Sequence, residues 1–170
     1  MPLLPPVLTQ GLLTLDEPKP PPDPATTALK WFDAWWNYFS GCAQLNPGTI
    51  PAAKLAAQGV FVPIMTPLIA ANQVPVPVPF FMGLEGAIRA AMATVLNPAF
   101  VIPGLYLAGI PSPVPLGPLM IPTAAIGMAS LSAKPPARIA LASIISGWTP
   151  SNTITQIVPP PVATIVVPIF

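Results

Sequence analysis

The chain has 170 residues, which is enough for one domain with its own core, and 29 of them are proline. It is 53% hydrophobic but only 6% charged, with a net charge of +1, whereas a soluble domain carries about 25% charged residues. We therefore expect much of its surface to face protein or lipid, and the lack of any basic cluster argues against nucleic-acid binding.

The residue types on which most catalytic and metal sites depend are scarce. The chain contains no histidine, which excludes Ser-His-Asp and Cys-His arrangements and histidine metal ligands. Cys42 is the only cysteine, so it forms no intrachain disulfide, and we interpret it as a small buried hydrophobe. Four of the five acidic residues precede residue 34, where arm or capping roles suffice. We expect a non-catalytic protein with no cofactor, no metal and no small-molecule substrate.

Residues 1–24 contain eight prolines, which predicts an extended, polyproline-like N-terminal arm. The first residues are apolar but lack a basic segment and are interrupted by proline, so we expect no signal peptide. Asp23 followed by Pro24 is the favoured arrangement for the start of a helix. The sequence therefore predicts a helix that begins directly after the arm.

This first helix runs to about Cys42, and its polar residues fall on one narrow stripe, which leaves a wide aromatic surface. Two interpretations stay open for that surface: a core helix, or an anchor for a partner, because clustered Trp and Tyr are typical of binding hot spots. The candidate interface residues of the whole chain are Trp31, Trp35, Trp36, Tyr38, Phe39, Phe80, Phe81 and Trp148.

A second, shorter helix is predicted from Pro51 to about Phe61, with Thr49 as its cap, because Pro63 and Pro67 interrupt a longer one. The run VPVPVPF at 74–80 is predicted to be extended.

A third helix is predicted over Phe81–Leu96. It places five apolar residues on one side and Glu85 four residues before Arg89, an ion pair that adds only a few tenths of a kcal/mol on a helix surface.

Residues 98–122 carry seven prolines and predict a long apolar loop system. A fourth helix is predicted from Pro136 to Ser146, stopped by Gly147, with Ile139, Ile144 and Ile145 as apolar contacts. The β-branched runs NTITQIV and VATIVV then predict two strands. Because they are short and flanked by proline, we interpret them as edge strands or strands donated to a neighbour.

The resulting fold prediction is a mainly α protein with long extended Pro-rich loops and short C-terminal edge or donated β-strands, irregular and dependent on assembly. Its parts are an arm at 1–24, a single helical domain at 25–148 and an extended C-terminal arm at 149–170. The two proline-free runs long enough to cross a bilayer each carry two charged residues, which argues against a membrane span.

The order of the segments ALKWFDAWWNYF, FFMGLEGAIRAAMATVL and PPARIALASIISGWTPSNTITQIV resembles that in small apolar Ala/Pro-rich virion structural proteins of large tailed bacteriophages and related contractile particles. The resemblance implies a minor protein of a tail, baseplate or capsid, made in the host cytoplasm, whose partners are other structural proteins and copies of itself. Two alternatives stay open: a subunit of a membrane-associated complex, and a Pro-rich interaction module that presents KPPPDP to aromatic grooves.

Overall fold

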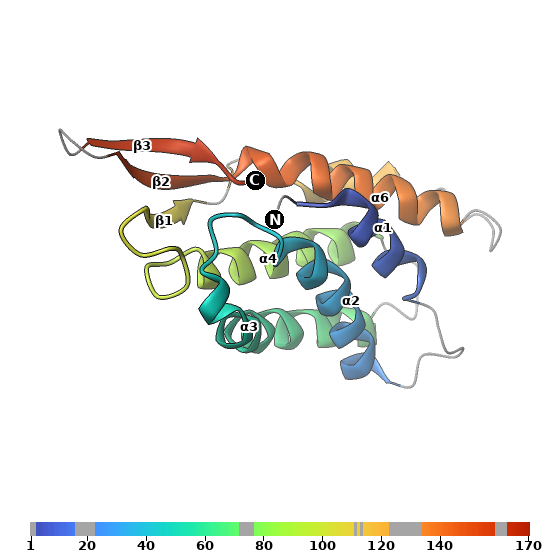
Figure 1. The fold of residues 1–170 in the computed structure, drawn as a ribbon. Helices are drawn as coiled ribbons and strands as arrows, with labels where there is room; N and C mark the ends of the chain where they lie inside the picture. The colour runs from blue at the N-terminus through green and yellow to red at the C-terminus, as the bar shows by residue number, and fades with distance from the viewer. Residues whose placement is uncertain are drawn as a thin grey trace.

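A computed structural model describes residues 3–15, 23–71, 77–110, 112, 114–122, 134–158 and 163–170. The described chain is mainly helical, with a small antiparallel sheet, as the sequence predicts (Figure 1). Its helices are α1 (Pro5–Leu13), α2 (Pro24–Phe39), α3 (Ile50–Ala71), α4 (Pro77–Val95) and α6 (Lys134–Trp148), and residues 117–122 are also helical. Its strands are β1 (Tyr106–Ile110), β2 (Thr153–Val158) and β3 (Ala163–Pro168).

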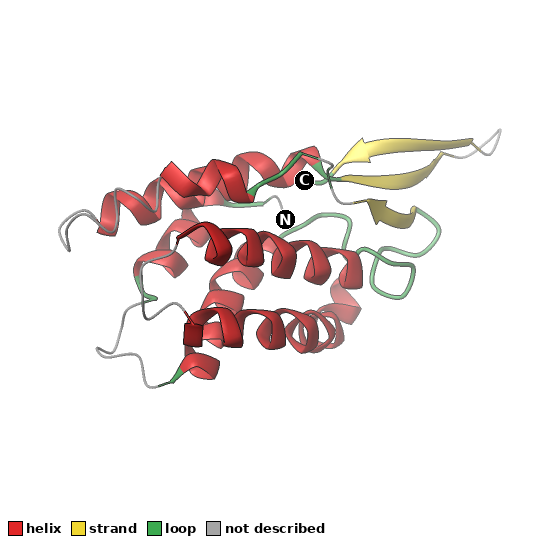
Figure 2. Cartoon of the chain, turned by 180° about the vertical axis from the view of Figure 1, so that it is seen from behind, coloured by secondary structure: helices red, strands yellow, loops and turns green. Residues whose placement is uncertain are grey.

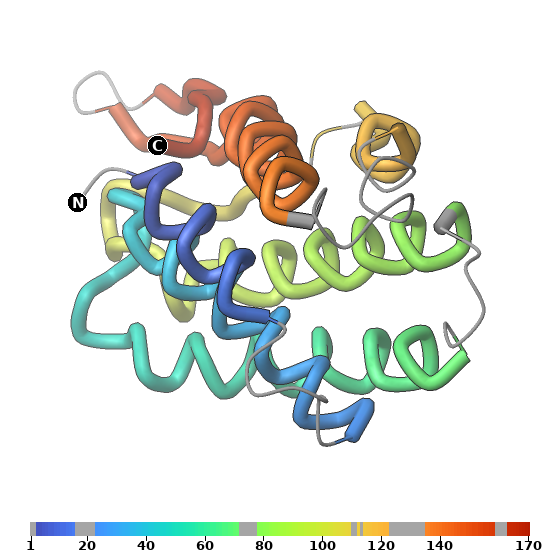
Figure 3. The backbone as a smooth tube through the Cα atoms, turned by 90° about the vertical axis from the view of Figure 1, so that its right-hand side faces the viewer, coloured from blue at the N-terminus to red at the C-terminus, as the bar shows by residue number. Residues whose placement is uncertain are grey.

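The helices form a layered body from which the sheet projects at one end (Figures 1 and 2). At the base, α3 lies beside α4, and α2 packs against α3 on the side facing the core. On the opposite side, α1 lies between α2 and α6, as the view along the body shows (Figure 3). The core therefore lies between these helices and reaches the root of the sheet.

The extended arm predicted for residues 1–24 is wrong over Pro5–Leu13, which form α1. Pro5 and Pro6 occupy the first helical positions, where a backbone N–H has no intrahelical partner and its loss costs little. Leu8 and Leu12 are buried one turn apart, so the segment belongs to the core of the chain. Residues 16–22 of the predicted arm lie outside the described residues.

The helix predicted to end near Phe61 instead continues as α3 to Ala71, through Pro63 and Pro67. The two prolines are four residues apart and exposed, on one face with Gly59. Each proline removes the donor for the carbonyl four residues earlier, so the carbonyl groups of Gly59 and Pro63 lose their helical partner. Because this face is exposed, water can solvate those groups, which explains why the helix is not broken there.

The helix predicted from Phe81 begins earlier, at Pro77, so the extended conformation predicted for 74–80 is wrong over its last four residues. Pro77 and Pro79 fall in the first turn, where proline is tolerated. Residues 74–76 lie outside the described residues. The apolar side predicted for this helix is confirmed, and all its members are buried: Phe81, Leu84, Ile88, Met92 and Val95.

The Pro-rich segment at 98–122 contains more regular structure than the loop predicted for it. β1 lies within it, and Gly109 of this strand packs so closely on Leu96 that a Cβ would lie 2.6 Å from the Leu96 Cβ.

The helix predicted to end at Ser146 is α6, which continues through Gly147 and ends at Trp148. Of the apolar contacts predicted there, Ile145 is buried, whereas Ile139 is about half exposed.

Both predicted C-terminal strands are confirmed and pair within the chain, but β2 is the central strand of the sheet, so the edge position predicted for both is wrong for β2. The sheet has the order β1-β2-β3 and is antiparallel throughout. β2 and β3 are in continuous register from Thr153 opposite Pro168 to Val158 opposite Ala163, whereas the pairing of β1 with β2 shifts between Tyr106 and Gly109. β3 is therefore an outer strand of this sheet.

Candidate functional site

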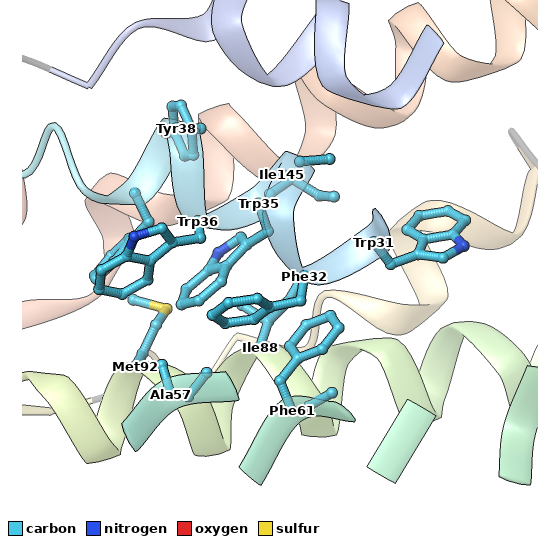
Figure 4. Close-up of a cluster of buried hydrophobic side chains, with 14 of the residues drawn as sticks. Trp31, Phe32, Trp35, Trp36, Tyr38, Ala57, Phe61, Ile88, Met92 and Ile145 are labelled. Atoms are coloured by element: carbon cyan, nitrogen blue, oxygen red, sulfur yellow. The ribbon is translucent and has the colours of Figure 1, made fainter. Parts of the chain in front are cut away.

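The predicted interface aromatics lie in the core of the chain. All eight are at most 8% exposed: Trp31, Trp35, Trp36, Tyr38, Phe39, Phe80, Phe81 and Trp148. Figure 4 shows side chains of α2 directed toward Phe61 of α3 and toward Ile88 and Met92 of α4. The core interpretation is therefore the one the structure supports, and these residues offer no free surface to a partner.

Phe61 fixes the position of α3 on the aromatic cluster. Its ring centroid lies 5.6 Å from that of Phe32 and 6.1 Å from that of Trp35, and its plane is nearly parallel to the Trp35 ring. Trp35 also stacks on Phe39 at 4.9 Å. Such contacts add about 0.5–1.5 kcal/mol each to the area they bury. The indole N–H of Trp35 is buried without a hydrogen-bond partner in the described chain, so this cluster is held by packing alone.

The spacing predicts an ion pair on a helix surface, but the Glu85–Arg89 pair is mostly buried and bonds to backbone groups of another segment. Glu85 is buried, and its Oε1 accepts from Nε of Arg89 at 2.7 Å while its Oε2 accepts from the backbone N–H of Gly117 at 2.6 Å. Arg89 donates to the carbonyl oxygens of Ser112 and Val114, and its guanidinium lies 5.1 Å from the centre of the Trp148 ring. The pair thus fastens the backbone of Ser112, Val114 and Gly117 onto α4.

Electrostatics favours the ionised form of Glu85. Burial raises the pKa of the carboxyl, but the hydrogen bonds from Gly117 and Arg89 outweigh burial and hold the pKa below its usual value. Both carboxylate oxygens are engaged by donors of the chain itself. The arrangement clamps two segments together. Within the described residues, no three His, Cys, Asp or Glu side chains are placed to hold a metal ion.

Gln44 is a second buried polar residue, after Glu85, that links distant segments of the chain by hydrogen bonds, and the sequence analysis did not identify it. Its Nε2 donates to the Pro168 carbonyl oxygen at 3.0 Å, and its Oε1 accepts from the Phe170 N–H and from the Cys42 thiol. The Ala43 N–H adds a bond of 2.7 Å to the Phe170 carbonyl oxygen. These bonds fix the end of β3 to the segment that follows α2. Burial raises the pKa of the Cys42 thiol to about 11, in keeping with the buried role predicted for it.

Asn152 is a third buried polar residue that links distant segments, and its hydrogen bonds hold the root of the sheet. It is completely buried; its Oδ1 accepts from the Ser112 N–H at 2.6 Å, and its Nδ2 donates to the Thr149 carbonyl oxygen at 3.0 Å. Its backbone carbonyl accepts from Ile169. Gln44 has Asn46 two residues away, and Asn152 lies between Ser151 and Thr153, so no local pattern in the sequence singles these two residues out as internal hydrogen-bonding centres.

Exposed apolar side chains lie on several elements, among them α3 and the projecting β2–β3 hairpin. Leu55 of α3 is 71% exposed, and Val166 of β3 is 63% exposed. Five of the six residues of β3 are exposed, and neither strand of the hairpin contains a charged residue. The hairpin extends beyond the helical body (Figure 2). It is therefore the candidate functional surface of the described chain.

Helical spans of 47–71 and 78–95 are each long and apolar enough, by length and composition alone, to cross a membrane. Such helices also occur in the cores of soluble proteins, and half of the apolar stretch of α4 is buried in this chain. In α3 the fully buried share is 22%, and further apolar side chains of this helix, such as Val60, Ile64 and Leu68, are partly buried against the core.

Comparison with protein-family models, with curated proteins and with solved structures finds no match to this chain.

Proposed function

We propose that this chain is a non-catalytic structural component of a large protein assembly, in which it joins neighbouring subunits. The observation that carries the proposal is the projecting, uncharged β2–β3 hairpin, whose outer strand is exposed along almost its whole length. An exposed apolar edge strand promotes association. A surface of this kind fits a chain whose hairpin is covered by a neighbour.

The composition of the outer surface supports the same proposal. Many large apolar side chains are more than a third exposed: Leu4, Leu13, Leu55, Val78, Met82, Leu105, Leu107, Val114, Leu119, Ile139, Ile165, Val166 and Phe170. Removing apolar surface from water contributes about 25 cal/mol per Å². With only 6% charged residues to keep this surface solvated, covering it by partner subunits is strongly favoured.

The assembly we favour is a virion, with this chain as a minor protein of a tail, baseplate or capsid. That finer proposal depends on the resemblance in segment order, and it would place many copies in symmetric contacts with other structural proteins and with each other. Mass spectrometry of purified particles tests it directly. Detection of the chain at a constant ratio to the major particle proteins is the expected result, and its absence from particles that contain all other structural proteins would exclude this location.

Sedimentation of the isolated full chain tests the broader proposal. We expect concentration-dependent association at micromolar concentration. A soluble monomer that stays monomeric across that range would overturn the structural-assembly proposal, because it would show that the apolar surface needs no cover.

A subunit of a membrane-associated complex is the second candidate, favoured by α3, an apolar helix long enough to cross a bilayer of which only 22% is fully buried. It predicts that the chain is released from cell membranes only by detergent. Release by high salt alone, or recovery in the soluble particle fraction, would exclude it.

A further inference from the structure

Over Ala163–Val167, the outer edge of β3 has none of the features that natural proteins use to prevent edge-to-edge pairing. These residues carry no lysine or other charge, their pairing with β2 shows no bulge, and the one proline of β3 is its last residue, Pro168. No strand of the described chain pairs with the outer side of β3, where Gln44 engages only the Pro168 carbonyl. This edge can therefore accept another strand.

Two backbone hydrogen bonds identify which backbone groups point outward. Ile157 N–H donates to Leu105 on the β1 side, whereas the Asn152 carbonyl accepts from Ile169 on the β3 side. Because antiparallel residues alternate between the two sides, even-numbered residues of β2 bond to odd-numbered residues of β3. The N–H and C=O groups of Thr164 and Val166 therefore face outward. Pro168 fits this pattern, since its carbonyl is the one that Gln44 reaches from outside the hairpin.

The outward groups of Thr164 and Val166 are complementary to those of a second copy of the same strand. We propose that two chains pair antiparallel along β3, with Ile165 opposite Ile165 of the other copy on a two-fold axis. Thr164 of each copy then lies opposite Val166 of the other, and each such pair exchanges two N–H to C=O bonds. Four bonds form, and no outward group of Thr164 or Val166 is left without a partner.

Shifting the register by two residues loses this match. If Val166 lay on the axis, Thr164 would face Pro168, which has no N–H and whose carbonyl is already bonded to Gln44. A shift by one residue is incompatible with a two-fold axis perpendicular to the sheet, because residues of opposite faces would then be paired. Among the pairings made by residues 163–168 alone, the one with Ile165 on the axis therefore forms the most hydrogen bonds.

The pairing joins the two three-stranded sheets into a single six-stranded sheet, in which β1-β2-β3 of one chain is followed by β3-β2-β1 of the other. Since the hairpin projects from the helical body (Figure 1), antiparallel pairing places the two bodies at opposite ends of the joint sheet. The interface is isologous, so one contact is used twice. This inference deepens the proposed structural role, on which it rests, by naming the partner and the register.

Cysteine cross-linking of the full chain tests the register. Cys42→Ser supplies a background without the native thiol, and Ile165→Cys or Val166→Cys is added to it. In the proposed dimer the two Ile165 positions face each other as a non-hydrogen-bonded pair, with Cα atoms about 4.5 Å apart. The two Val166 positions are offset by two residues and lie about 8 Å apart, beyond the reach of an unstrained disulfide.

We expect the Ile165→Cys chain to form the covalent dimer under mild oxidation roughly tenfold faster, or more, than the Val166→Cys chain. Random collision predicts the reverse order, because Val166 is 63% exposed and Ile165 only 46%. Equal rates, or faster cross-linking at Val166, would overturn the proposed pairing.

A backbone variant provides an independent test. Val166→Pro removes an outward N–H and leaves the bonds of β3 to β2 intact, whereas Val166→Thr keeps that N–H and serves as the matched control. By sedimentation we expect Val166→Pro to weaken dimerisation at least tenfold and Val166→Thr to retain it. Circular dichroism of both variants checks that the helical body is folded.

The outcomes separate this inference from the proposed function. If the wild-type chain associates but Ile165→Cys shows no preference and Val166→Pro associates normally, the β3 pairing is wrong and the structural role stands on another surface. If the wild-type chain is a monomer at all concentrations, the proposed function fails as well.

Discussion

The side-chain amide of Gln44 donates a 3.0 Å hydrogen bond to the carbonyl oxygen of Pro168, 124 residues further along the chain. The same side chain accepts from Phe170, so one glutamine holds both ends of the tripeptide that follows the exposed part of β3. The hairpin is thereby fixed at its root although it projects at its tip. This rigidity matters for any role in which the hairpin presents a defined edge to a neighbour.

Gln44→Leu should lower the free energy of unfolding by about 1–3 kcal/mol, because it removes two partly buried hydrogen bonds, one to the Pro168 carbonyl and one from the Phe170 N–H, each worth about 0.5–1.5 kcal/mol. Urea denaturation followed by circular dichroism measures the effect. Gln58→Leu, at a half-exposed position of α3, is the control and should change stability by less than about 0.5 kcal/mol. Equal effects of the two substitutions would contradict the role assigned to Gln44.

Glu85→Gln should destabilise the chain at neutral pH and reduce its sensitivity to acid. The folded-state pKa of Glu85 is lowered, so its ionisation stabilises the fold above the unfolded pKa, and that contribution is lost as pH falls through the folded pKa. The difference in unfolding free energy between wild type and variant should be roughly 1–3 kcal/mol near pH 7 and shrink toward about pH 3.

Asp33→Asn is the matched control for that measurement. Asp33 forms an ion pair with Lys54 at 2.8 Å, but both side chains are well exposed. Such pairs contribute less than about 1 kcal/mol. A pH dependence of the Glu85→Gln difference that is no larger than that of Asp33→Asn would show that the buried clamp is unimportant for stability.

Two glycine-to-alanine substitutions inside helices should act in opposite directions. A Cβ on Gly86 of α4 meets no atom within 4 Å, so Gly86→Ala should stabilise the chain by roughly 0.5–1 kcal/mol. A Cβ on Gly11 of α1 would lie 2.9 Å from the Cα of Ala34, so Gly11→Ala must push α1 away from α2 and should destabilise by about 1–3 kcal/mol. Thermal melts of both variants check this; stabilisation by Gly11→Ala would show that α1 is not packed on α2.

Cys42 should react with thiol reagents only when the chain opens. Its thiol is 3% exposed and has a pKa raised to about 11, so almost no thiolate exists in the folded state at pH 7. We expect labelling to be at least roughly a hundredfold faster in denaturant than in buffer, given the stability of ordinary domains. Rapid labelling of the folded chain would contradict the burial of this residue.

Much of the secondary structure can be predicted from local signals. Asp23 caps α2 through a 2.8 Å bond from the Thr26 N–H, as the Asp-Pro pair predicts, and the β-branched runs form β2 and β3. The apolar side of α4 follows from helical spacing. In each case the residues that decide the structure are neighbours in sequence.

The predictions based on proline were wrong at α1 and α3, because proline is tolerated in the first turn of a helix and on an exposed helix face. Pro5 and Pro6 begin α1, and Pro63 and Pro67 lie on the exposed face of α3, so none of them breaks a helix. No local pattern shows which face a proline will occupy before the packing of the helix is known.

The candidate site was harder to predict because it depends on long-range contacts. By residue type, the aromatic residues of α2 suit a core or an interface equally well. Only their contacts with Phe61 and with α4 in the folded chain show that they belong to the core. The backbone edge of β3 has no sequence signature of its own, since it follows from which strand lies outermost in the sheet.

The core contains Leu8 near the beginning of the sequence and Ile169 near its end, and both are completely buried. During synthesis, at about 5–20 residues per second, the ribosome must therefore release nearly the whole sequence before this core can close. Until then the apolar helices are exposed to the cell. We therefore expect the apolar helices to need cover, from chaperones or from neighbouring subunits, until Ile169 has left the ribosome.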